Sequence, residues 1–498
     1  MSCTDRIAAL RSAAALIPLA MVCGCTVGPN FHPPAPPPVD GYSARAAPAQ
    51  TASATVPGGE AQVFVAGMDV PAEWWGLFQS PAIDALVREA LRANPDLKAA
   101  EAALKSAREL DLAQRGARYP TVGASYSPSR QRTSATLSPP LNTNTDVYTL
   151  HTAQLEVGYV PDVFGGIRRQ IETTTAQAEA QRFQTEATYL TLTSNLVAGA
   201  VQEASLRRQV QATEALIVAN RAILAAMRDE KAAGQIASGD VAAQEQALYQ
   251  AEATLPPLRK QLEQQRHLIA ALIGRYPSQA PGEALDLDAL QLPRALPVSL
   301  PAKLVVQRPD VRAAEASLHA ASAQIGVAIA ARLPAFQLTA DAGGLAQTLG
   351  GLFSSGNGFW TVAGTVAQPI YQGGTLLHRQ RAAEAAYDQA GAQYQSTVIK
   401  AFQNVADTLT ALETDADQLR ATAGVEHSAG AALQIALQQY QAGQATRLAA
   451  LNAEVAYQQA VLNRVQAQAG RYADTAALFQ ALGGGWWNRT DAVAKAGL

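Results

Sequence analysis

The sequence predicts an α+β membrane protein that combines a few transmembrane β-strands with very long coiled-coil helices. Three observations lead to this fold class. Four short segments alternate apolar and polar residues, two long stretches lack proline and carry a heptad-like apolar pattern, and landmarks of the first half recur in the same order in the second. Because each half shows the same sequence of segments, we expect an internal tandem duplication with two strands in each half.

The N-terminus has the layout of a bacterial export signal. Arg6 and Arg11 provide a basic start, and residues 13–22 form a short apolar run. That run is too short to span a bilayer, which takes about 20 residues. No other uninterrupted apolar run reaches that length, so we expect no membrane-spanning helix.

Cys25 has the sequence context of a lipid-attachment site. Val22 and Gly24, three residues and one residue before it, resemble the lipobox of bacterial lipoproteins, although Cys23 stands where Ala, Ser or Thr is more usual. The resemblance implies that residues 1–24 are a signal peptide and that Cys25 carries lipid on its sulfur and on the new amino group. The alternatives are a plain signal peptide with an incidental cysteine and a C-x-C metal site, although structural zinc requires four ligands.

Composition and motifs argue against several other classes of protein. The net charge is -3, which gives no electrostatic attraction to nucleic acid. An enzyme would need convergent polar groups, yet the six histidines are scattered and no H-E-x-x-H, G-x-S-x-G or phosphate-binding loop is present. We therefore expect no catalytic residues, no cofactor and no metal site.

The second half of the chain repeats landmarks of the first half. The offset is 214 residues for two landmarks and 208 and 209 residues for the other two. The four pairs are "NPDLKAAE" at 94–101 with "RPDVRAAE" at 308–315, "RYPTVGAS" at 118–125 with "RLPAFQLT" at 332–339, "YVPDVFGG" at 159–166 with "AQPIYQGG" at 367–374, and "AAGQIASGD" at 232–240 with "QAGQATRLA" at 441–449. This period is far too long for a solenoid and indicates duplication of a whole structural unit.

Each half contains two segments with the period-two alternation of β-strands. Their apolar and polar faces, and a length of about ten residues, fit strands of a transmembrane β-barrel. A half-buried sheet in a soluble sandwich is the alternative, but only four such segments exist and they are far apart in the sequence. Four strands cannot close a barrel around a lumen, so several chains would have to contribute.

The remaining segments predict coiled-coil helices of unusual length. About 67 residues lie between Gly166 and Gly234, and about 68 between Gly374 and Gly443, which allows helices of about 100 Å. Apolar residues follow a 4, 3 spacing that is typical of a coiled-coil seam. The seam positions are Val398, Phe402, Val405, Leu409, Leu412, Ala416 and Leu419, then Leu451, Val455, Gln458, Leu462, Val465, Ala469, Tyr472, Ala476 and Phe479. A filamentous coiled coil is the alternative, but it leaves the strands unexplained.

These segments predict the following division of the mature chain. Residues 25–70, rich in Pro, Ala and Gly, form an extended N-terminal tether. The first repeat covers 71–292, with a β-hairpin at 119–161, and the second covers 293–482, with a β-hairpin at 334–369. Residues 483–498 form a C-terminal tail.

Several ordered motifs together resemble the TolC-type outer-membrane factors, and in particular the NodT-like lipoprotein branch that serves tripartite RND efflux systems. The motifs are "GCTVGPNFHPP" at 24–34, "WWGLFQSPAIDALVREALRANPDL" at 74–97, "YVPDVFGG", "QPIYQGG", "AFQNVADTL" at 401–409, "ALNAEVAYQQA" at 450–460 and "LFQALGGGWW" at 478–487. Each motif alone is weak, whereas the ordered set is specific and covers nearly the whole mature chain.

The resemblance implies a homotrimer in which each chain gives four strands to a twelve-stranded β-barrel. The long helices then form a periplasmic α-helical barrel with a mixed equatorial domain. The implied function is passive conduction of drugs or other small toxic compounds across the outer membrane, with a periplasmic adaptor protein and an inner-membrane RND-type transporter as partners and a lipid anchor in the outer membrane. Alternatives are a duct for protein secretion and a periplasmic coiled-coil structural lipoprotein.

The resemblance also implies where a periplasmic gate would lie. The Tyr-x-x-Gly motif of the second half corresponds to Tyr440 and Gly443, which would stand at the turn between two helices. By position, Leu448 would be a constricting apolar residue, and Asn452 and Ala449 would occupy places that are acidic in TolC. Alternatively, Leu448 belongs to the coiled-coil seam and Asn452 to a solvated helix face.

Overall fold

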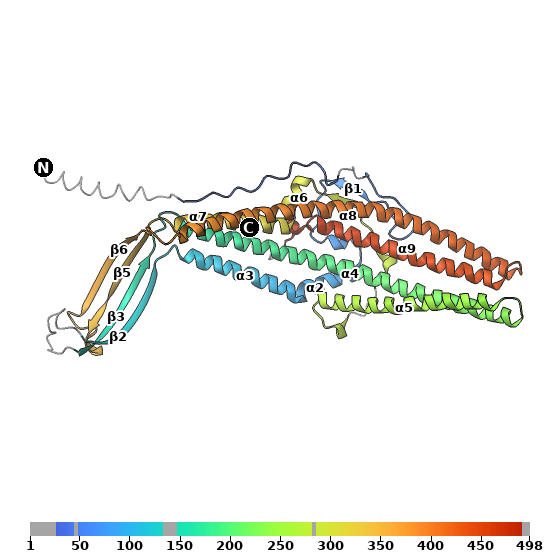
Figure 1. Cartoon of the computed structure of the whole chain (residues 1–498), viewed down its shortest axis with the longest axis horizontal. Coiled ribbons are helices and arrows are strands. Elements are labelled where there is room, and N and C mark those ends of the chain that lie inside the picture. The colour runs from blue at the N-terminus through green and yellow to red at the C-terminus, as the bar shows by residue number, and fades with distance from the viewer. Residues whose placement is uncertain (1–25, 44–47, 133–146, 281–284, 491–498) are drawn as a thin grey trace. The chain divides into compact units, whose positions relative to one another are not determined.

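The computed structural model (Figure 1) describes most of the chain, including both predicted repeats. The described residues are 26–43, 48–132, 147–280 and 285–490. The candidate lipid-attachment residue Cys25 and the signal peptide lie outside these ranges. The main elements in chain order are β1 Val63–Ala66, α2 Pro81–Ala93, α3 Pro95–Gly116, β2 Thr121–Arg132, β3 Val147–Tyr159, α4 Gly166–Ala232, α5 Ser238–Leu272, β4 Ala295–Val298, α6 Pro301–Gln307, α7 Pro309–Ala330, β5 Ala335–Ala346, β6 Gly358–Ala367, α8 Thr375–Gln441 and α9 Arg447–Ala481. Short 3₁₀ turns lie between or after these elements, among them Trp74–Phe78 before α2 and Trp486–Asn488 after α9.

The chain forms two compact units that are each assembled from three segments. Unit 1 consists of the described residues of Met1–Pro34 together with Lys105–Ala180 and Ala314–Tyr394, and it contains all four long strands. Unit 2 consists of Ala35–Leu104, Gln181–Ala313 and Gln395–Leu498, as far as these are described. Helices α3, α4, α7 and α8 contribute residues to both units.

The element lengths confirm the predicted tandem duplication. Helices α4 and α8 both have 67 residues, α5 and α9 both have 35, and α3 and α7 both have 22. Strands β2 and β5 both have 12 residues. The strands fall within the hairpins predicted at 119–161 and 334–369.

Buried side chains follow the predicted seam positions of α8 and α9. In α8, Val405 and Leu412 are fully buried, and in α9 the same holds for Val465 and Tyr472. Helices α8 and α9 run in opposite directions. Glu426 of α8 contacts Arg464 of α9, whereas Asp415, which comes earlier in α8, contacts Gly470, which comes later in α9. The two helices therefore run antiparallel.

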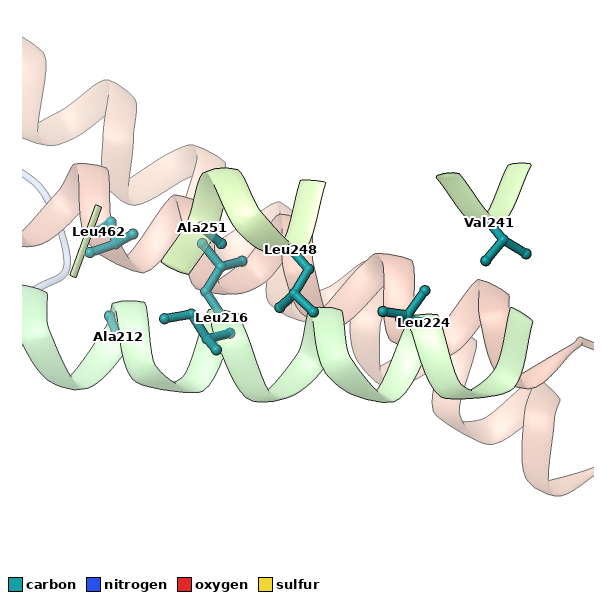
Figure 2. Packing of buried hydrophobic residues seen from close by; sticks show 8 residues of the cluster. Ala212, Leu216, Leu224, Val241, Leu248, Ala251 and Leu462 are labelled. Atoms are coloured by element: carbon teal, nitrogen blue, oxygen red, sulfur yellow. The ribbon is translucent and has the colours of Figure 1, made fainter. Parts of the chain in front are cut away.

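An apolar cluster also ties α9 to the first helical pair (Figure 2). Its members are Ala212, Leu216, Ile217 and Leu224 of α4, Val241, Leu248 and Ala251 of α5, and Leu462 of α9. Leu462 is the one member from the second repeat among the buried residues of this cluster. Side chains of this kind each contribute about 1.5–3 kcal/mol when fully buried, so the cluster stabilises the three-helix contact.

Helix α5 continues through Pro256 and Pro257, where proline would ordinarily break a helix. Both prolines are exposed, as is Ala253, whose carbonyl loses its helical donor to Pro257. Water can satisfy a carbonyl on this solvent side. Buried Ala251 before the prolines and Leu262 after them pack against other helices and hold both parts of α5 in line.

In unit 2, the segment predicted as a tether is extended but packed against the second repeat. Strand β1 pairs in parallel with β4, with Val63 opposite Ala295. The fully buried Arg471 of α9 donates a hydrogen bond of 3.0 Å to the Thr51 hydroxyl and another to the Glu60 carbonyl. The sequence pattern missed this contact because a Pro/Ala/Gly-rich composition indicates only that no helix forms.

Residues 26–31 are fixed within unit 1. The guanidinium of Arg169 donates hydrogen bonds to the carbonyls of Val27 and Gly28 and to the Asn30 side chain, at 2.8–3.1 Å. Gly28 has φ +89, and a Cβ added there would lie 2.4 Å from the Cα of Gly326 in α7. Glycine is therefore required on both sides of this contact.

The C-terminal segment beyond α9 also packs into unit 2 as far as it is described. Trp486 donates a 2.7 Å hydrogen bond to the Gln307 carbonyl, and Arg489 forms a 2.6 Å ion pair with the buried Glu186. Trp74 stacks on Phe479, with ring centroids 5.4 Å apart. The segments around Trp74 and Trp486 therefore both pack into unit 2.

One described helix, α4, has an 18-residue window that is long and apolar enough to be tested as a membrane span. Its mean hydropathy is 1.2, and 61% of the window is buried inside the protein. A buried window of this kind is typical of a core helix. It is therefore weak evidence for a span.

Candidate functional site

Four antiparallel strands form one sheet in unit 1, in the order β2-β3-β5-β6. The two hairpins come from the two repeats and join where β3 pairs with β5. Val122 of β2 lies opposite Val157 of β3, which lies opposite Ala340 of β5, which lies opposite Val362 of β6. The next row across the sheet is Gly123, Glu156, Asp341 and Thr361.

Because successive residues of a strand point to opposite faces, this register separates most apolar from most polar side chains. Near the hairpin ends the faces mix, since Arg130 and His151 lie on the mainly apolar face, and Leu150, Leu345 and Phe359 lie on the mainly polar one. One face carries Val122, Ala124, Tyr126, Ala153, Leu155, Val157, Tyr159, Phe336, Leu338, Ala340, Ala342, Trp360, Val362 and Val366. The opposite face carries Ser125, Ser127, Thr152, Gln154, Glu156, Gln337, Thr339, Asp341, Thr361 and Thr365. The faces are those that the sequence alternation predicts.

The apolar face is open to the surroundings in the single chain. Trp360 is 77% exposed, Val362 72% and Val122 71%. Within the described residues, β2 and β6 are the edges of the sheet, each paired on one side only. The sheet thus presents an uncovered apolar surface and two unpaired edges.

The candidate gate residues lie at the turn between α8 and α9 in unit 2. Tyr440 is 44% exposed in the last turn of α8, and Gly443 follows with φ +70. The Gly443 N–H donates to the Tyr440 carbonyl at 3.0 Å, and the Gln444 N–H donates to the Gln439 carbonyl at 2.8 Å. These two bonds form a Schellman motif, which satisfies carbonyls at a helix end and favours glycine at the left-handed position.

The turn between α4 and α5 has the same backbone design. Gly234 has φ +75, and its N–H donates to the Lys231 carbonyl at 2.9 Å, while the Gln235 N–H donates to the Glu230 carbonyl at 2.9 Å. The caps of the following helices differ. Thr446 accepts a hydrogen bond from the Ala449 N–H at the start of α9, whereas at α5 the Asp240 carboxylate accepts from the Ala237 N–H.

Leu448 and Asn452 lie one turn apart in the first two turns of α9. Residues i and i+4 share a helix face. Leu448 is half-buried, Asn452 is exposed and Ala449 is exposed. The structure therefore brings the four predicted gate residues to one turn region, and their position at a constriction remains a prediction.

The two coiled-coil pairs differ in their ionic contacts. Four ion pairs join α4 to α5 at 2.6–3.2 Å along one side of the pair. They are Arg221–Glu252, Arg228–Glu245, Glu214–Arg259 and Glu203–Arg266. Between α8 and α9, the ion pair seen in the described part of the chain is Glu426–Arg464.

A carboxyl pair in the α8–α9 seam was missed by sequence reasoning. Asp415 of α8 lies against Gly470 of α9, where an added Cβ would be 3.2 Å from Asp415 Oδ2. Asp474 follows one turn after Gly470 on the same helix face, and its carboxyl is close enough to raise the pKa of Asp415 by hydrogen bonding and by charge. Burial and, to a lesser extent, the neighbouring Asp474 carboxyl together raise the pKa of Asp415 to about 7, against the opposing charge of Arg471. Burial also lowers the pKa of Arg471.

A metal site among the described residues would require several ligating side chains to lie close together. No group of three or more His, Cys, Asp or Glu side chains lies close enough together there to bind a metal ion. The candidate lipid-attachment residue Cys25 is outside the described ranges, so the structure does not test it.

Comparison with known proteins agrees with this architecture. The sequence family described as "Outer membrane efflux protein" matches residues 86–275 and 300–484. The solvent efflux pump outer membrane protein SrpC of Pseudomonas putida is 31% identical over 477 residues, which cover 94% of this chain and 97% of SrpC.

Solved structures with a similar fold are outer-membrane channels. The outer-membrane channel OprN superposes with a TM-score of 0.79 at 26% identity, over 93% of this chain and 100% of OprN. The open state of the Neisseria gonorrhoeae MtrE outer membrane channel has a TM-score of 0.74 at 26% identity, over 94% of this chain and 100% of MtrE.

Proposed function

Because this chain belongs to the outer membrane efflux protein family, we propose that it is the outer-membrane exit duct of a tripartite efflux pump. The duct conducts drugs, solvents or other small toxic compounds passively out of the cell. A periplasmic adaptor protein and an inner-membrane RND-type transporter are its partners, and the transporter supplies the energy. The solvent pump assignment of SrpC supports this class of substrate.

The observation that carries the proposal is the two-faced sheet with unpaired edges. An apolar face with Trp360 and Val362 exposed suits contact with lipid, and a polar face with Glu156 and Asp341 suits a water-filled lumen. Each unpaired backbone group in lipid costs several kcal/mol, so β2 and β6 require partners. Four strands cannot surround a lumen, and three copies of the chain give the twelve strands of a closed barrel.

The long helices also support assembly from several copies. Helix α4 is largely buried within the chain, whereas its repeat counterpart α8 is mostly exposed. Ile399 and Ile435 of α8 are 60% and 55% exposed. In a homotrimer, a neighbouring copy covers this apolar surface and closes the helices into a barrel.

A lipid anchor on Cys25 and a gate at the α8–α9 turn complete the proposal. In the trimer, three copies of Leu448 form an apolar constriction, and the three Asn452 side chains face the same lumen. Apolar constrictions close pores by resisting wetting. The ion pairs favour α8–α9 as the pair that moves. Three exposed ion pairs join α4 to α5, each worth about 0.2–1 kcal/mol, and a fourth includes the buried Glu203.

A matched pair of substitutions tests the barrel. Val362 and Thr361 are neighbours in β6 and are both exposed in the single chain, but they lie on opposite faces. Arginine on the lipid face of a barrel costs about 2–4 kcal/mol at the midplane. We expect Val362→Arg to prevent recovery of a detergent-extracted trimer and Thr361→Arg to leave it intact, as measured by light scattering with detergent correction.

Equal recovery of both arginine variants would contradict the assignment of the two faces. A soluble monomer of the mature chain in the absence of detergent would contradict the shared barrel itself.

Export is tested in a strain that lacks its own outer-membrane efflux channel but retains an adaptor and an RND-type transporter. Expression of this chain should restore tolerance to toluene, and Thr361→Arg should retain that effect if the barrel forms. Secretion of a protein substrate without any gain in solvent tolerance would favour the protein-secretion duct instead.

A further inference from the structure

The Asp415–Asp474 pair occupies an unusual place for two carboxyl groups. The surrounding positions of the seam are apolar and fully or almost fully buried, among them Leu412, Ala416 and Ala476. Gly470 has no side chain, which leaves the space that the Asp415 carboxyl fills. Two carboxyl groups that share a buried site can hydrogen-bond only if one of them is protonated.

Among the described residues, no cation forms an ion pair with Asp415, although the charge of Arg471 acts on it. Asp474 and Arg471, both of α9, are the ionisable groups that act on it, and Glu60 of the segment before β1 acts on Arg471 in turn. The Nη atoms of Arg471 are occupied by oxygens of residues 51, 52 and 60. Asp415 Oδ2 and Arg471 Nε are both buried without a hydrogen-bond partner among the described residues.

We propose that Asp415 and Asp474 form a proton-dependent latch between α8 and α9. With one shared proton, the Asp415–Asp474 hydrogen bond holds the two helices together. When that proton is lost, two carboxylates face each other in an apolar seam, and the helices separate there to admit water or to bring Asp415 to the free Arg471 Nε. The latch thus biases the pair that carries the candidate gate.

The direction of the pH effect follows from the raised pKa. A carboxyl group has a pKa of about 3.9 in an unfolded chain, whereas Asp415 has a pKa of about 7 here. Below the unfolded value both states are protonated and the pair imposes no penalty. The seam therefore weakens progressively as the pH rises between these values, and the full penalty is present above about pH 7.

This inference rests on the proposed channel function for its conductance readout but not for its structural one. In planar bilayers, the resting conductance of the purified trimer should rise with pH and level off above about pH 7. Asp415→Asn should lose this transition and stay at the low-conductance level, because the amide can donate to Asp474 at every pH. Asp474→Asn should behave in the same way, since its amide can donate to an ionised Asp415.

The matched control is Asp407→Asn, which removes an exposed carboxyl from the same helix. It should keep the pH transition of the wild type. Retention of that transition in both Asp415→Asn and Asp474→Asn, or its loss in Asp407→Asn, would overturn the latch.

A measurement without conduction separates the latch from the channel function. Infrared spectra of the wild type at about pH 6, below the raised pKa, should show a protonated-carboxyl band that Asp415→Asn abolishes. The thermal midpoint of the wild-type trimer should fall from about pH 5.5 to about pH 8.5, and that of Asp415→Asn should change less. If the infrared and thermal results are as expected but the trimer conducts no ions, the latch is upheld and the channel function is rejected. If the protonated-carboxyl band is absent, the latch alone is rejected.

Discussion

Alanine at Gly443 of the α8–α9 turn can be compared with alanine at Gly234 of the α4–α5 turn. The comparison tests whether the two turns have the same free energy of local opening but different functions. Gly443 and Gly234 have φ angles of +70 and +75, and an added Cβ at either position meets nothing within 4 Å. The cost of alanine is therefore conformational, without a steric clash. The left-handed conformation costs an L-residue about 1–2 kcal/mol, and the reduced freedom of the unfolded chain offsets about 0.4–1 kcal/mol of this.

The net cost is about 1 kcal/mol at each turn, which corresponds to a roughly fivefold change in a local opening equilibrium. Hydrogen exchange followed by mass spectrometry should show this increase in peptides that contain the Gln444 and Gln235 amides, which donate the outer bond of each turn. Asparagine tolerates the left-handed region better than alanine does. Gly443→Asn should therefore show a smaller increase.

The functional readouts of the two alanine variants should differ. If the α8–α9 turn forms the gate, Gly443→Ala raises the resting conductance in planar bilayers, whereas Gly234→Ala changes exchange to the same extent and leaves conductance as in the wild type. Equal conductance changes in both variants would refute a gate specific to α8–α9. A much larger exchange effect at one turn would refute the equivalence of the two Schellman motifs.

Three further predictions concern the gate, the anchor and the N-terminal contact. Leu448→Ala should raise the resting conductance. Asn452→Asp should add three negative charges to the trimer lumen and so introduce block by divalent cations. Strong cation block of the wild type would contradict the placement of Asn452. Cys25→Ser should abolish labelling with palmitate while the trimer still assembles, and equal labelling of wild type and variant would contradict acylation at Cys25. Gly326→Ala places a Cβ 2.8 Å from Arg169 Cγ and 2.9 Å from the Val27 carbonyl oxygen. Residues 26–31 of this variant should therefore become sensitive to limited proteolysis. If the variant resists proteolysis as well as the wild type does, the contact can adjust to the added methyl group.

The strands and the seam were predictable because each depends on a local repeat in the sequence. Period-two alternation placed Leu155 and Glu156 on opposite faces, and the register of the sheet agrees. The 4, 3 spacing identified Val465 and Tyr472 as buried. In both cases one periodic face is enough to determine which side chains meet, without knowledge of distant parts of the chain.

The carboxyl pair was not predictable because it depends on more than one packing partner. By the 4, 3 spacing, Asp474 falls between the seam positions Tyr472 and Ala476 on the outer side of the helix, where an acid is ordinarily solvated. Yet the second half of α9 is buried on several sides, since the segment that contains Thr51 and β1 covers it as well as α8. A single-helix pattern contains no information about such a second layer.

The two repeats share their helix lengths and turns but differ in the side chains that join the paired helices. Both repeats have helices of 67 and 35 residues, joined by turns with the same hydrogen bonds. The turns therefore give neither pair a reason to move more than the other, although α5 also contains Pro256 and Pro257 and α9 contains no proline. The side chains differ, because α4–α5 carries a ladder of ion pairs such as Arg221–Glu252, whereas the α8–α9 seam contains two carboxyl groups that repel each other once ionised. These charge differences favour motion of α8–α9, and an ion pair of the Arg221–Glu252 type introduced between α8 and α9 should hold the gate closed.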